Sequence, residues 1–331
     1  MALKVAIFGA TGMVGETMRK CLEERQFPVA ELRLFASERS EGETRPFHGD
    51  PIKVELLSES RLKGLDLVLA SLPAKMSLQW NRLAANMGAW VVDNSSAFRM
   101  DPKVALVVPE VNGAVLASAK SRIIANPNCS TIQMLVALNE WHKKAGIKRI
   151  IVSTYQASSG KGQEAVNELT AQAKAFGRGE TIPPATVHAD RLFGNLVTGD
   201  WSTSEGGFND EEFKIIQETR KILGDESVLV APTTVRVPVW NAHSESIAVE
   251  LKAPLSLEEA IGLLRTAPGV KFAENPQEWT PNFADGKDEV FVGRVRPDPS
   301  CANGFLLWVV ADNLRKGAAL NAVQIAELIK R

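Results

Sequence analysis

Cysteine, surplus charge and long apolar runs are all scarce in this chain of 331 residues. Its three cysteines, Cys21, Cys129 and Cys301, are too few and too widely spaced for a disulfide framework, and no Cys-X-X-Cys pair suggests a metal. Lys and Arg number 38 against 39 Asp and Glu, so no basic surplus points to nucleic acid or an anionic membrane. No segment approaches the roughly 18 apolar residues of a membrane helix. We therefore expect no metal and a small-molecule partner.

Targeting signals and repeats are also missing. The apolar run before Gly9 is too short for a secretory signal peptide and lacks a cleavage pattern. Reduced, scattered thiols are typical of a cytoplasmic protein. With 45% hydrophobic and 23% charged residues, the chain is expected to fold as two ordinary globular domains.

The order of the apolar segments predicts an α/β fold. In the first part, short apolar strands alternate with helical spacing, which indicates a doubly wound, mostly parallel sheet. After residue 129 the pattern changes to a second α+β layer. Strands are expected at 4–8, 32–36, 65–70, 89–92 and 123–125, then at 149–154, 246–251, 290–295 and 304–311; helices at 14–25, 162–176, 210–223 and 314–330; and a loop at 198–209.

A glycine-rich turn follows the first strand. Gly9, Gly12 and Gly15 have the spacing GxxGxxG, a variant of the dinucleotide fingerprint, at the point where a strand leads into a helix. Backbone N–H groups and the helix dipole at such a place can hold a pyrophosphate. The alternative is a simple tight turn.

The end of the second strand bears on the choice of nucleotide. An NAD enzyme commonly has an acidic residue there, whereas this chain has Ser37, Glu38, Arg39 and Ser40. Arg39 with two hydroxyl groups suits a 2'-phosphate and favours NADP. Glu38 could instead bind the ribose, and Arg39 could be solvated surface.

Cys129 is the candidate nucleophile. It follows Asn-Pro-Asn after a strand and precedes an apolar run at 132–138 with helical character. A thiol at a helix N-terminus is stabilised as the thiolate, which makes the sulfur nucleophilic at neutral pH. A single cysteine is more often a small core residue. Cys21, on an apolar helix face, and Cys301, in a loop, have no comparable support.

One of the four histidines stands out as an acid/base candidate. His48, His142 and His188 lie in contexts compatible with solvent exposure. His243 lies where an extended apolar stretch carrying Arg236 runs into a polar turn, which can project an imidazole and a cation into one pocket. A hydrogen-bonded structural histidine is the alternative.

Several charged residues are candidates for binding an anionic substrate. Arg236 can grip a carboxylate with two parallel hydrogen bonds. Glu211 and Lys214 share a helix face and could hold an ammonium and a phosphate, or form an exposed ion pair. Arg99 follows the fourth strand, near the ligand edge of the sheet, and suggests an anion there.

Together these segments resemble the bacterial aspartate-semialdehyde dehydrogenases, over nearly the whole chain. The similar segments are GATGMVG, NPNCST around Cys129, STYQASSG around Gln156, RVPV with HSES, FVGRVR, and ANGFLLWVVADN. Two positions depart from the family: Ala242 replaces the usual Gly before the histidine, and Thr234 replaces the usual Cys. The segment 182–209 is shorter and less familiar, so no role is assigned within it.

The resemblance implies a role for each matching residue. Cys129 would form an acyl thioester, with His243 as acid/base and Gln156 aligning the substrate. Arg236 would hold the substrate carboxylate and Glu211, or alternatively Glu212, its amino group. The expected phosphate and substrate contacts further include Arg99, Asn128 and Lys214, and the expected NADP contacts are Gly9, Thr11, Gly12, Met13, Val14, Ser37, Arg39, Ser40, Ser159, Gly160 and Asn313.

The same resemblance implies the activity and the assembly. The expected reaction is the reversible, NADP-dependent reductive dephosphorylation of L-4-aspartyl phosphate to L-aspartate semialdehyde, in lysine, threonine and methionine biosynthesis. A homodimer is expected, with residues 1–128 and 313–331 as the dinucleotide-binding domain and 129–312 as the catalytic and dimerisation domain. The alternatives are an enzyme like N-acetyl-γ-glutamyl-phosphate reductase and a non-catalytic relative with a binding role.

Overall fold

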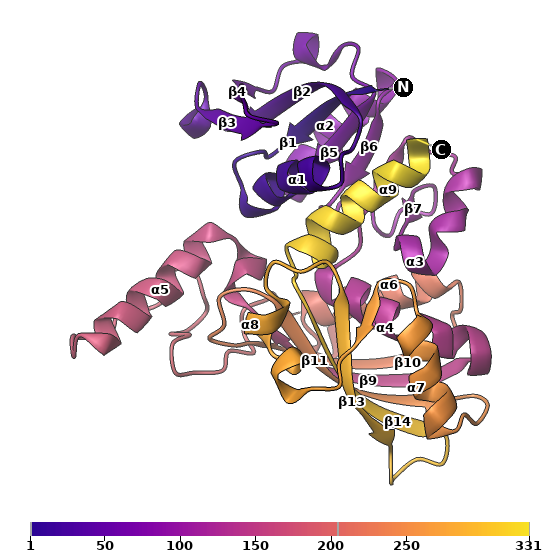
Figure 1. Ribbon diagram of the computed structural model, residues 1–331. Coiled ribbons are helices and arrows are strands. Elements are labelled where there is room, and N and C mark those ends of the chain that lie inside the picture. The colour runs from indigo at the N-terminus through magenta and orange to yellow at the C-terminus, as the bar shows by residue number, and fades with distance from the viewer. Residues whose placement is uncertain (1, 204, 331) are drawn as a thin grey trace. The chain divides into compact units, whose positions relative to one another are not determined.

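The computed structural model describes residues 2–203 and 205–330, which form two compact units. Unit 1 comprises Met1–Asn128 and Gly317–Arg331, and unit 2 comprises Cys129–Lys316. Each unit contains its own sheet with helices packed against it (Figure 1). Within the described ranges, no helix is both long and apolar enough to cross a membrane.

Unit 1 contains a mostly parallel sheet. Its described strands run in the order β3-β4-β2-β1-β5-β6-β8-β7, and only the β3–β4 pair is antiparallel. The strands are β1 (Leu3–Phe8), β2 (Val29–Ala36), β3 (Thr44–Phe47), β4 (Asp50–Leu56), β5 (Leu67–Ala70), β6 (Trp90–Asp93), β7 (Ala105–Leu106) and β8 (Ile123–Ala125). Central strands such as β5 are buried along their whole length, as expected for parallel strands covered on both faces.

Helices from both ends of the chain cover this sheet. They are α1 (Met13–Glu24), α2 (Ala74–Asn86), α3 (Pro109–Asn112) and α9 (Leu320–Lys330). Buried residues of α9 join those of α1 and β1 in one apolar cluster. At the exposed edge of this contact, Arg25 forms a bidentate ion pair with Glu327, with both hydrogen bonds at 2.7 Å. The last segment of the chain is therefore part of unit 1.

Unit 2 contains a mixed sheet. Its described strands run in the order β10-β9-β11-β14-β13-β12, namely β9 (Ile147–Gln156), β10 (Leu229–Arg236), β11 (His243–Leu251), β12 (Val270–Phe272), β13 (Val290–Pro297) and β14 (Gly304–Ala311). Its helices are α4 (Cys129–Ala145), α5 (Gln163–Gly177), α6 (Asp210–Leu223), α7 (Leu257–Thr266) and α8 (Pro281–Ala284). Of these, α4, α6 and α7 pack on one face of the sheet (Figure 1). A doubly wound first sheet with a second α+β part is the predicted fold class, which is confirmed.

The strands of unit 2 alternate between a covered and an open face. On β9, Ile150, Val152 and Gln156 are buried beneath the helices, whereas Ile151 is 44% exposed on the opposite face. Leu229 of the neighbouring strand, 52% exposed, lies on that open face too. The covered face carries polar side chains only where the strands approach the start of α4.

Candidate active site

The nucleotide loop, residues 9–15, has a backbone that only glycine fits at two positions. Gly9 has a φ of +78°, and a Cβ there would collide with the carbonyl oxygen of Ser71. A Cβ on Gly15 would collide with the carbonyl oxygen of Gly9. Gly12 is the N-cap of α1, and no described side chain caps this helix end. The backbone N–H groups in the first turn of α1 are therefore available to a phosphate, which fits the predicted dinucleotide.

The place of this loop in the sheet agrees with nucleotide binding. β1 pairs with β2 on one side and with β5 on the other, so the chain changes direction across the sheet between β1 and β5. The nucleotide loop begins at the carboxyl end of β1, and the N–H of Ser71, just after β5, donates to the carbonyl of Phe8 (2.9 Å). Ligands of open parallel sheets bind at this kind of switch point.

The remaining candidates of unit 1 lie at the carboxyl ends of other strands. Ser37 and Arg39 are exposed and Ser40 is half-buried, in a short 3₁₀ turn directly after β2. Arg99 follows β6 and is buried, with its guanidinium donating to the carbonyl oxygens of Ser95 (3.1 Å) and Asn94 (2.9 Å). Asn128 is buried at the last position of the unit.

Cys129 is the first residue of α4 in unit 2, and its side chain is partly exposed. The helix continues for 17 residues, so a long row of peptide dipoles ends at the sulfur. The hydroxyl of the next residue, Ser130, accepts a hydrogen bond from Nε2 of Gln156 (3.2 Å). The N-terminus of α4 is thereby attached to the end of β9.

Three candidate residues lie side by side across the sheet of unit 2, and we call them the polar rung: Gln156, Arg236 and His243. Arg236 is the register partner of Gln156 on β10. On the other side, the pairing of Tyr155 with Ser244 brings His243 next to Gln156. All three side chains are at least 97% buried, at 1%, 3% and 0% exposed respectively. Strand register has assembled them from positions far apart in the sequence.

His243 is held as a neutral imidazole in a defined orientation. The N–H of Ala157 donates to its Nδ1 (3.0 Å), so in the neutral ring the proton is on Nε2, which has no hydrogen-bond partner among the described residues. Burial, and then the positive charge of Arg236, lower the pKa of His243 well below its ordinary value. The Nε2–H group is thus an available, uncharged donor.

Glu211 and Lys214 form the predicted ion pair, but it is not a surface pair. Their side chains are 3.2 Å apart, and that of Glu211 is only 7% exposed. Nε2 of Gln156 also lies 3.3 Å from Oε1 of Glu211, which joins this pair to the polar rung. Both oxygens of Glu212, by contrast, accept backbone N–H groups, from Asn209 and Thr234, each at 3.0 Å. Glu212 is a capping residue, which leaves Glu211 as the candidate for an amino group.

Ser159 and Asn313 support the turn before His243. The Ser159 hydroxyl lies 3.1 Å from Oδ1 of Asn313, and that oxygen accepts the N–H of Ala242 (2.9 Å). Ala242 has a φ of +69°, a left-handed conformation that suits glycine, the residue that the family resemblance leads us to expect at this position. Gly160 lies where an added Cβ would stand 3.0 Å from both Nε2 of His243 and Nη1 of Arg236. A side chain at position 160 would therefore crowd both groups of the polar rung.

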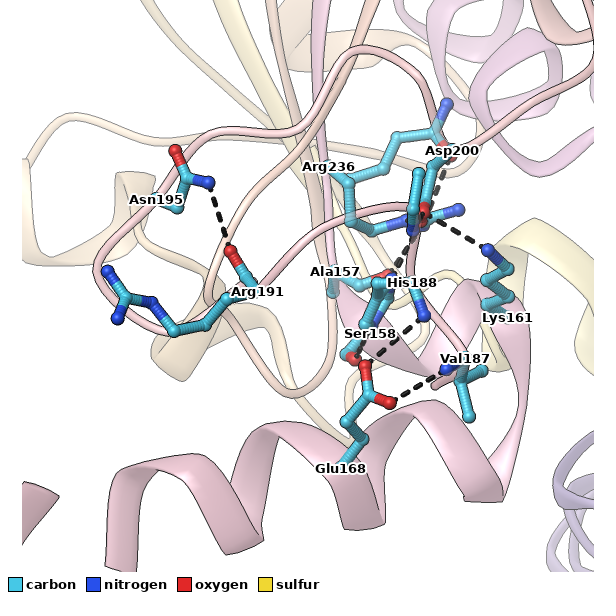
Figure 2. Close-up of polar contacts among 12 residues, drawn as sticks. Ala157, Ser158, Lys161, Glu168, Val187, His188, Arg191, Asn195, Asp200 and Arg236 are labelled. Atoms are coloured by element: carbon cyan, nitrogen blue, oxygen red, sulfur yellow. Dashed lines mark hydrogen bonds and ion pairs between the residues drawn. The ribbon is translucent and has the colours of Figure 1, made fainter. Parts of the chain in front are cut away.

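The expected exposure of His188 is wrong. His188 is 5% exposed, because its ring is held between the hydroxyl of Ser158 (2.9 Å) and Oδ2 of Asp200 (2.7 Å), as Figure 2 shows. Asp200 also accepts from Lys161 (3.1 Å) and from Nε of Arg236 (3.1 Å). Nothing in the local sequence signals these contacts, since they depend on the path of an irregular segment.

A second group that sequence reasoning missed is Glu245, two residues after His243 on the same strand face. Its side chain is fully buried, and neither carboxyl oxygen has a hydrogen-bond partner of normal geometry among the described residues. Burial raises its pKa well above the ordinary value, and the neighbouring Gln133 amide opposes this only in part. Burial without a partner therefore favours the protonated form of Glu245.

Comparison with known proteins agrees with both units. Residues 4–119 match the family model "Semialdehyde dehydrogenase, NAD binding domain", and residues 138–316 match "Semialdehyde dehydrogenase, dimerisation domain". The chain is 51% identical to the aspartate-semialdehyde dehydrogenase of Aquifex aeolicus, over 99% of this chain and 98% of that protein. It is 46% identical to aspartate-semialdehyde dehydrogenase 2 of Vibrio cholerae, over 99% and 97% of the two chains.

Solved structures show the same likeness. The crystal structure of aspartate semialdehyde dehydrogenase II of Vibrio cholerae complexed with ASA superposes with a TM-score of 0.95 at 44% identity, covering 100% of this chain and 99% of that one. A probable aspartate-semialdehyde dehydrogenase of Pseudomonas aeruginosa has a TM-score of 0.91 at 27% identity, with the same coverage. By its sequence, its two domains and its fold, the chain belongs to the aspartate-semialdehyde dehydrogenase family.

Proposed function

We propose that this chain is an NADP-dependent enzyme that interconverts L-4-aspartyl phosphate and L-aspartate semialdehyde through a thioester on Cys129. The observation that carries the proposal is the position of Cys129 as the first residue of α4, whose next residue, Ser130, is hydrogen bonded to the polar rung. A nucleophile, an acid and a carboxylate clamp are then available within one unit. These are the parts that this chemistry needs.

The first step is attack by the sulfur. The α4 dipole favours the Cys129 thiolate, which adds to the acyl carbon; the C–S bond forms and the C–O bond to phosphate breaks. Lys214, whose side chain is one-third exposed, carries positive charge that could receive the leaving phosphate, and the family resemblance implies Arg99 as a further phosphate contact. In the reverse direction the same groups would hold inorganic phosphate for attack on the thioester.

The second step needs a hydrogen-bond donor for a developing oxyanion. NADPH, when bound, supplies the hydride that reduces the thioester. The Nε2–H of His243 then donates a hydrogen bond to the oxyanion of the hemithioacetal on Cys129; as the C=O bond re-forms, the C–S bond breaks, which releases the aldehyde and restores the Cys129 thiolate, and the oxidative direction reverses these steps. Its lowered pKa and the Ala157 hydrogen bond at Nδ1 suit a neutral donor of this kind. The acid/base role that the resemblance implies for His243 also includes removal of the proton from the Cys129 thiol, and that step would require Nε2 without its proton.

Binding of the amino-acid head is assigned to Arg236 and Glu211. Both N–H groups of Arg236 Nη2 have no partner among the described residues and can donate to the substrate carboxylate. Oε1 of Glu211, the carboxylate oxygen near Gln156, can accept a hydrogen bond from the substrate ammonium. This argues against the N-acetyl-γ-glutamyl-phosphate alternative, because an acylated amine would present no charge to Glu211. The presence of nucleophile, acid and clamp together argues against a non-catalytic relative.

The cofactor and the assembly are further parts of the proposal. Arg39, exposed directly after β2, favours the 2'-phosphate of NADP. The exposed Ile151 and Leu229 on the open face of the unit 2 sheet favour a homodimer through this face. Placement in the cytoplasm and in lysine, threonine and methionine biosynthesis follows the family.

Formation of NADPH from L-aspartate semialdehyde and NADP, with and without inorganic phosphate, tests this function. We expect turnover that depends on phosphate, because the thioester needs phosphate as the acceptor. Turnover at the same rate without phosphate would indicate a hydrolytic aldehyde dehydrogenase instead. No turnover with either mixture would refute the activity.

A further inference from the structure

The Asp200 segment, residues 186–203, has no expected role, yet it contacts Arg236 in three ways. Val197 forms an isolated two-bonded bridge with the backbone of Arg236, at 3.0 and 2.8 Å. Oδ2 of Asp200 accepts from Nε of Arg236 (3.1 Å). The Trp201 ring lies under the guanidinium, 4.8 Å from ring centroid to Cζ. The backbone, one edge and one face of this arginine are therefore all held by the same segment.

The carboxylate of Asp200 is saturated with donors, and its side chain is fully buried. Its Oδ1 accepts from Lys161 (3.1 Å) and from the N–H of Ala189 (2.8 Å). Its Oδ2 accepts from Arg236 and from Nδ1 of His188 (2.7 Å). Figure 2 shows Lys161, His188 and Arg236 converging on the Asp200 side chain. Burial raises the pKa of Asp200, but the hydrogen bonds from His188, Ala189 and Lys161 outweigh it, so the group is ionised.

Ser158, His188 and Asp200 are connected in the order of a hydrolase triad, but the surroundings argue against that chemistry. Asp200 is shared with two cations, whereas a triad carboxylate serves its histidine. The Ser158 hydroxyl, 2.9 Å from Nε2, and Asp200, 2.7 Å from Nδ1, together fix the orientation of the His188 ring.

We propose that Asp200, oriented by His188, is a positioning residue for the Arg236 carboxylate clamp and so helps to select substrates that carry an α-carboxylate. The inference rests on the proposed function of Arg236. With Nε engaged by Asp200 and Nη1 by the carbonyl of Ala157 (2.8 Å), the guanidinium can present only Nη2 and its outer edge to a ligand. Because the guanidinium is already held in one orientation, binding loses less side-chain conformational entropy.

The sign of the effect separates positioning from simple charge balance. If Asp200 only neutralised Arg236, its removal would strengthen the attraction for a carboxylate substrate. If Asp200 positions Arg236, its removal weakens binding. Asn is the sharpest substitution, because whichever way the amide turns, its NH₂ group faces two donors that the carboxylate accepted.

The test compares kcat/KM for L-aspartate semialdehyde with that for 3-aminopropanal, which keeps the aldehyde and the amine but lacks the carboxylate. The wild type should prefer the first substrate, and Asp200→Asn should reduce this preference by about 10- to 100-fold, mainly through the KM for L-aspartate semialdehyde. The KM for phosphate and the kcat/KM for 3-aminopropanal should stay unchanged. A retained or increased preference would overturn the inference, and so would equal losses with both aldehydes.

Glu168→Gln is the matched control. Glu168 binds the same segment through the N–H groups of Thr186, Val187 and His188, but among the described residues it makes no hydrogen bond or ion pair with Arg236 or Asp200. Its substitution should lower the unfolding temperature without changing the substrate preference. An equal loss of preference in this variant would show that general loosening of the segment, and not Asp200, is responsible.

Two further outcomes keep the inference separate from the proposed function. An active wild type with no preference between the two aldehydes would remove the clamp role of Arg236, and this inference with it. If Asp200→Asn does not fold, His188→Gln decides, since it disturbs one of the two hydrogen bonds to the same Oδ2. A reduced preference in His188→Gln supports positioning, and an unchanged preference contradicts it.

Discussion

The nucleotide loop of unit 1 offers backbone groups to a ligand, whereas the polar rung of unit 2 offers side chains. The loop is made of backbone: Gly9 and Gly15 are needed because side chains would not fit, and the groups offered to a ligand are peptide N–H groups. The rung is made of buried side chains brought together by strand register, with each one fixed by neighbours such as Ala157, Ser130 and Asp200. A backbone site depends on a few adjacent residues, whereas a side-chain site depends on the whole unit.

The largest expected effect tests the chemistry of unit 2. Cys129→Ala should lower phosphate-dependent NADPH formation by at least about 10⁴-fold, because the variant has no atom to carry the thioester. Steady-state rates with a matched measurement of thermal unfolding would check this. Cys301→Ala, in a loop and outside the polar rung, should behave as the wild type. Wild-type turnover in Cys129→Ala would end the thioester mechanism.

A second effect tests whether unit 1 depends on backbone shape. Gly9→Ala should lower the free energy of unfolding by roughly 2 kcal/mol or more, since it adds a clash with Ser71 to a left-handed conformation, and NADP affinity should fall with it. Gly12→Ala is the internal control: its φ is −77° and its Cβ would lie 3.5 Å from the nearest atom. It should change the free energy of unfolding by less than about 1 kcal/mol. Equal losses in the two variants, by denaturant titration, would refute the backbone account.

A third effect concerns the side-chain part of the nucleotide site. Arg39→Ala should reduce the ratio of kcat/KM with NADPH to that with NADH by about 10-fold, because one charge-assisted contact to the 2'-phosphate is lost. Glu38→Gln should leave the NADPH value unchanged. If Glu38 binds the ribose instead, that variant will lose activity with NADH, and a wild type that prefers NADH will contradict the NADP assignment.

The smallest expected effect is the change in the free energy of unfolding caused by burying the Glu245 carboxyl group. The raised pKa of Glu245 means that the folded chain keeps this proton above pH 4.5, where the unfolded chain loses it. The contribution of Glu245 to the free energy of unfolding is therefore largest below pH 4.5, and it decreases as the pH rises towards the pKa of the folded state. Glu245→Gln should gain stability relative to the wild type between about pH 5 and pH 8, as measured by urea unfolding.

Glu250, on the same strand but partly exposed, provides the opposite control. Its pKa is lowered, first by the hydrogen bond from Lys148, so its stabilising contribution is lost as the pH falls. Glu250→Gln should therefore lose its small difference from the wild type under acidic conditions, the reverse of the trend for Glu245→Gln. The same trend in both variants would indicate a general charge effect and not burial of Glu245.

The comparison also explains what the sequence could predict. The central strands of unit 1, the helix after Gly12 and the start of a helix near Cys129 follow from local pattern, and the structure has them at Leu3–Phe8, Met13–Glu24 and Cys129–Ala145. The β3–β4 hairpin was not predicted, because its two strands are half exposed and carry no continuous apolar run. The strand β12 has only three residues, none of them fully buried, and gives a similarly weak signal. The helix α7, by contrast, begins with a capping box of Ser256 and Glu259, a local signal that could have predicted it.

The sequence predicts the polar rung only in part. Arg236 and His243 were singled out because they flank one turn, but their placement beside Gln156 needs the register of three strands. Buried His188 and Asp200 were not predictable, since polar residues in an irregular segment look like exposed loop. Their burial depends on a small apolar cluster of Leu169, Leu192 and Val197 that anchors the segment on α5.

The central claim is a covalent acyl group on one sulfur, and its capture is the most direct measurement. The protein would be mixed with L-4-aspartyl phosphate without reduced nucleotide, denatured in acid and measured as an intact mass and as peptides. The account predicts a gain of one aspartyl group, confined to the peptide with Cys129, labile to hydroxylamine and absent from Cys129→Ala. An unmodified protein that still reduces the substrate when NADPH is added, or an acyl group on another residue, would contradict it.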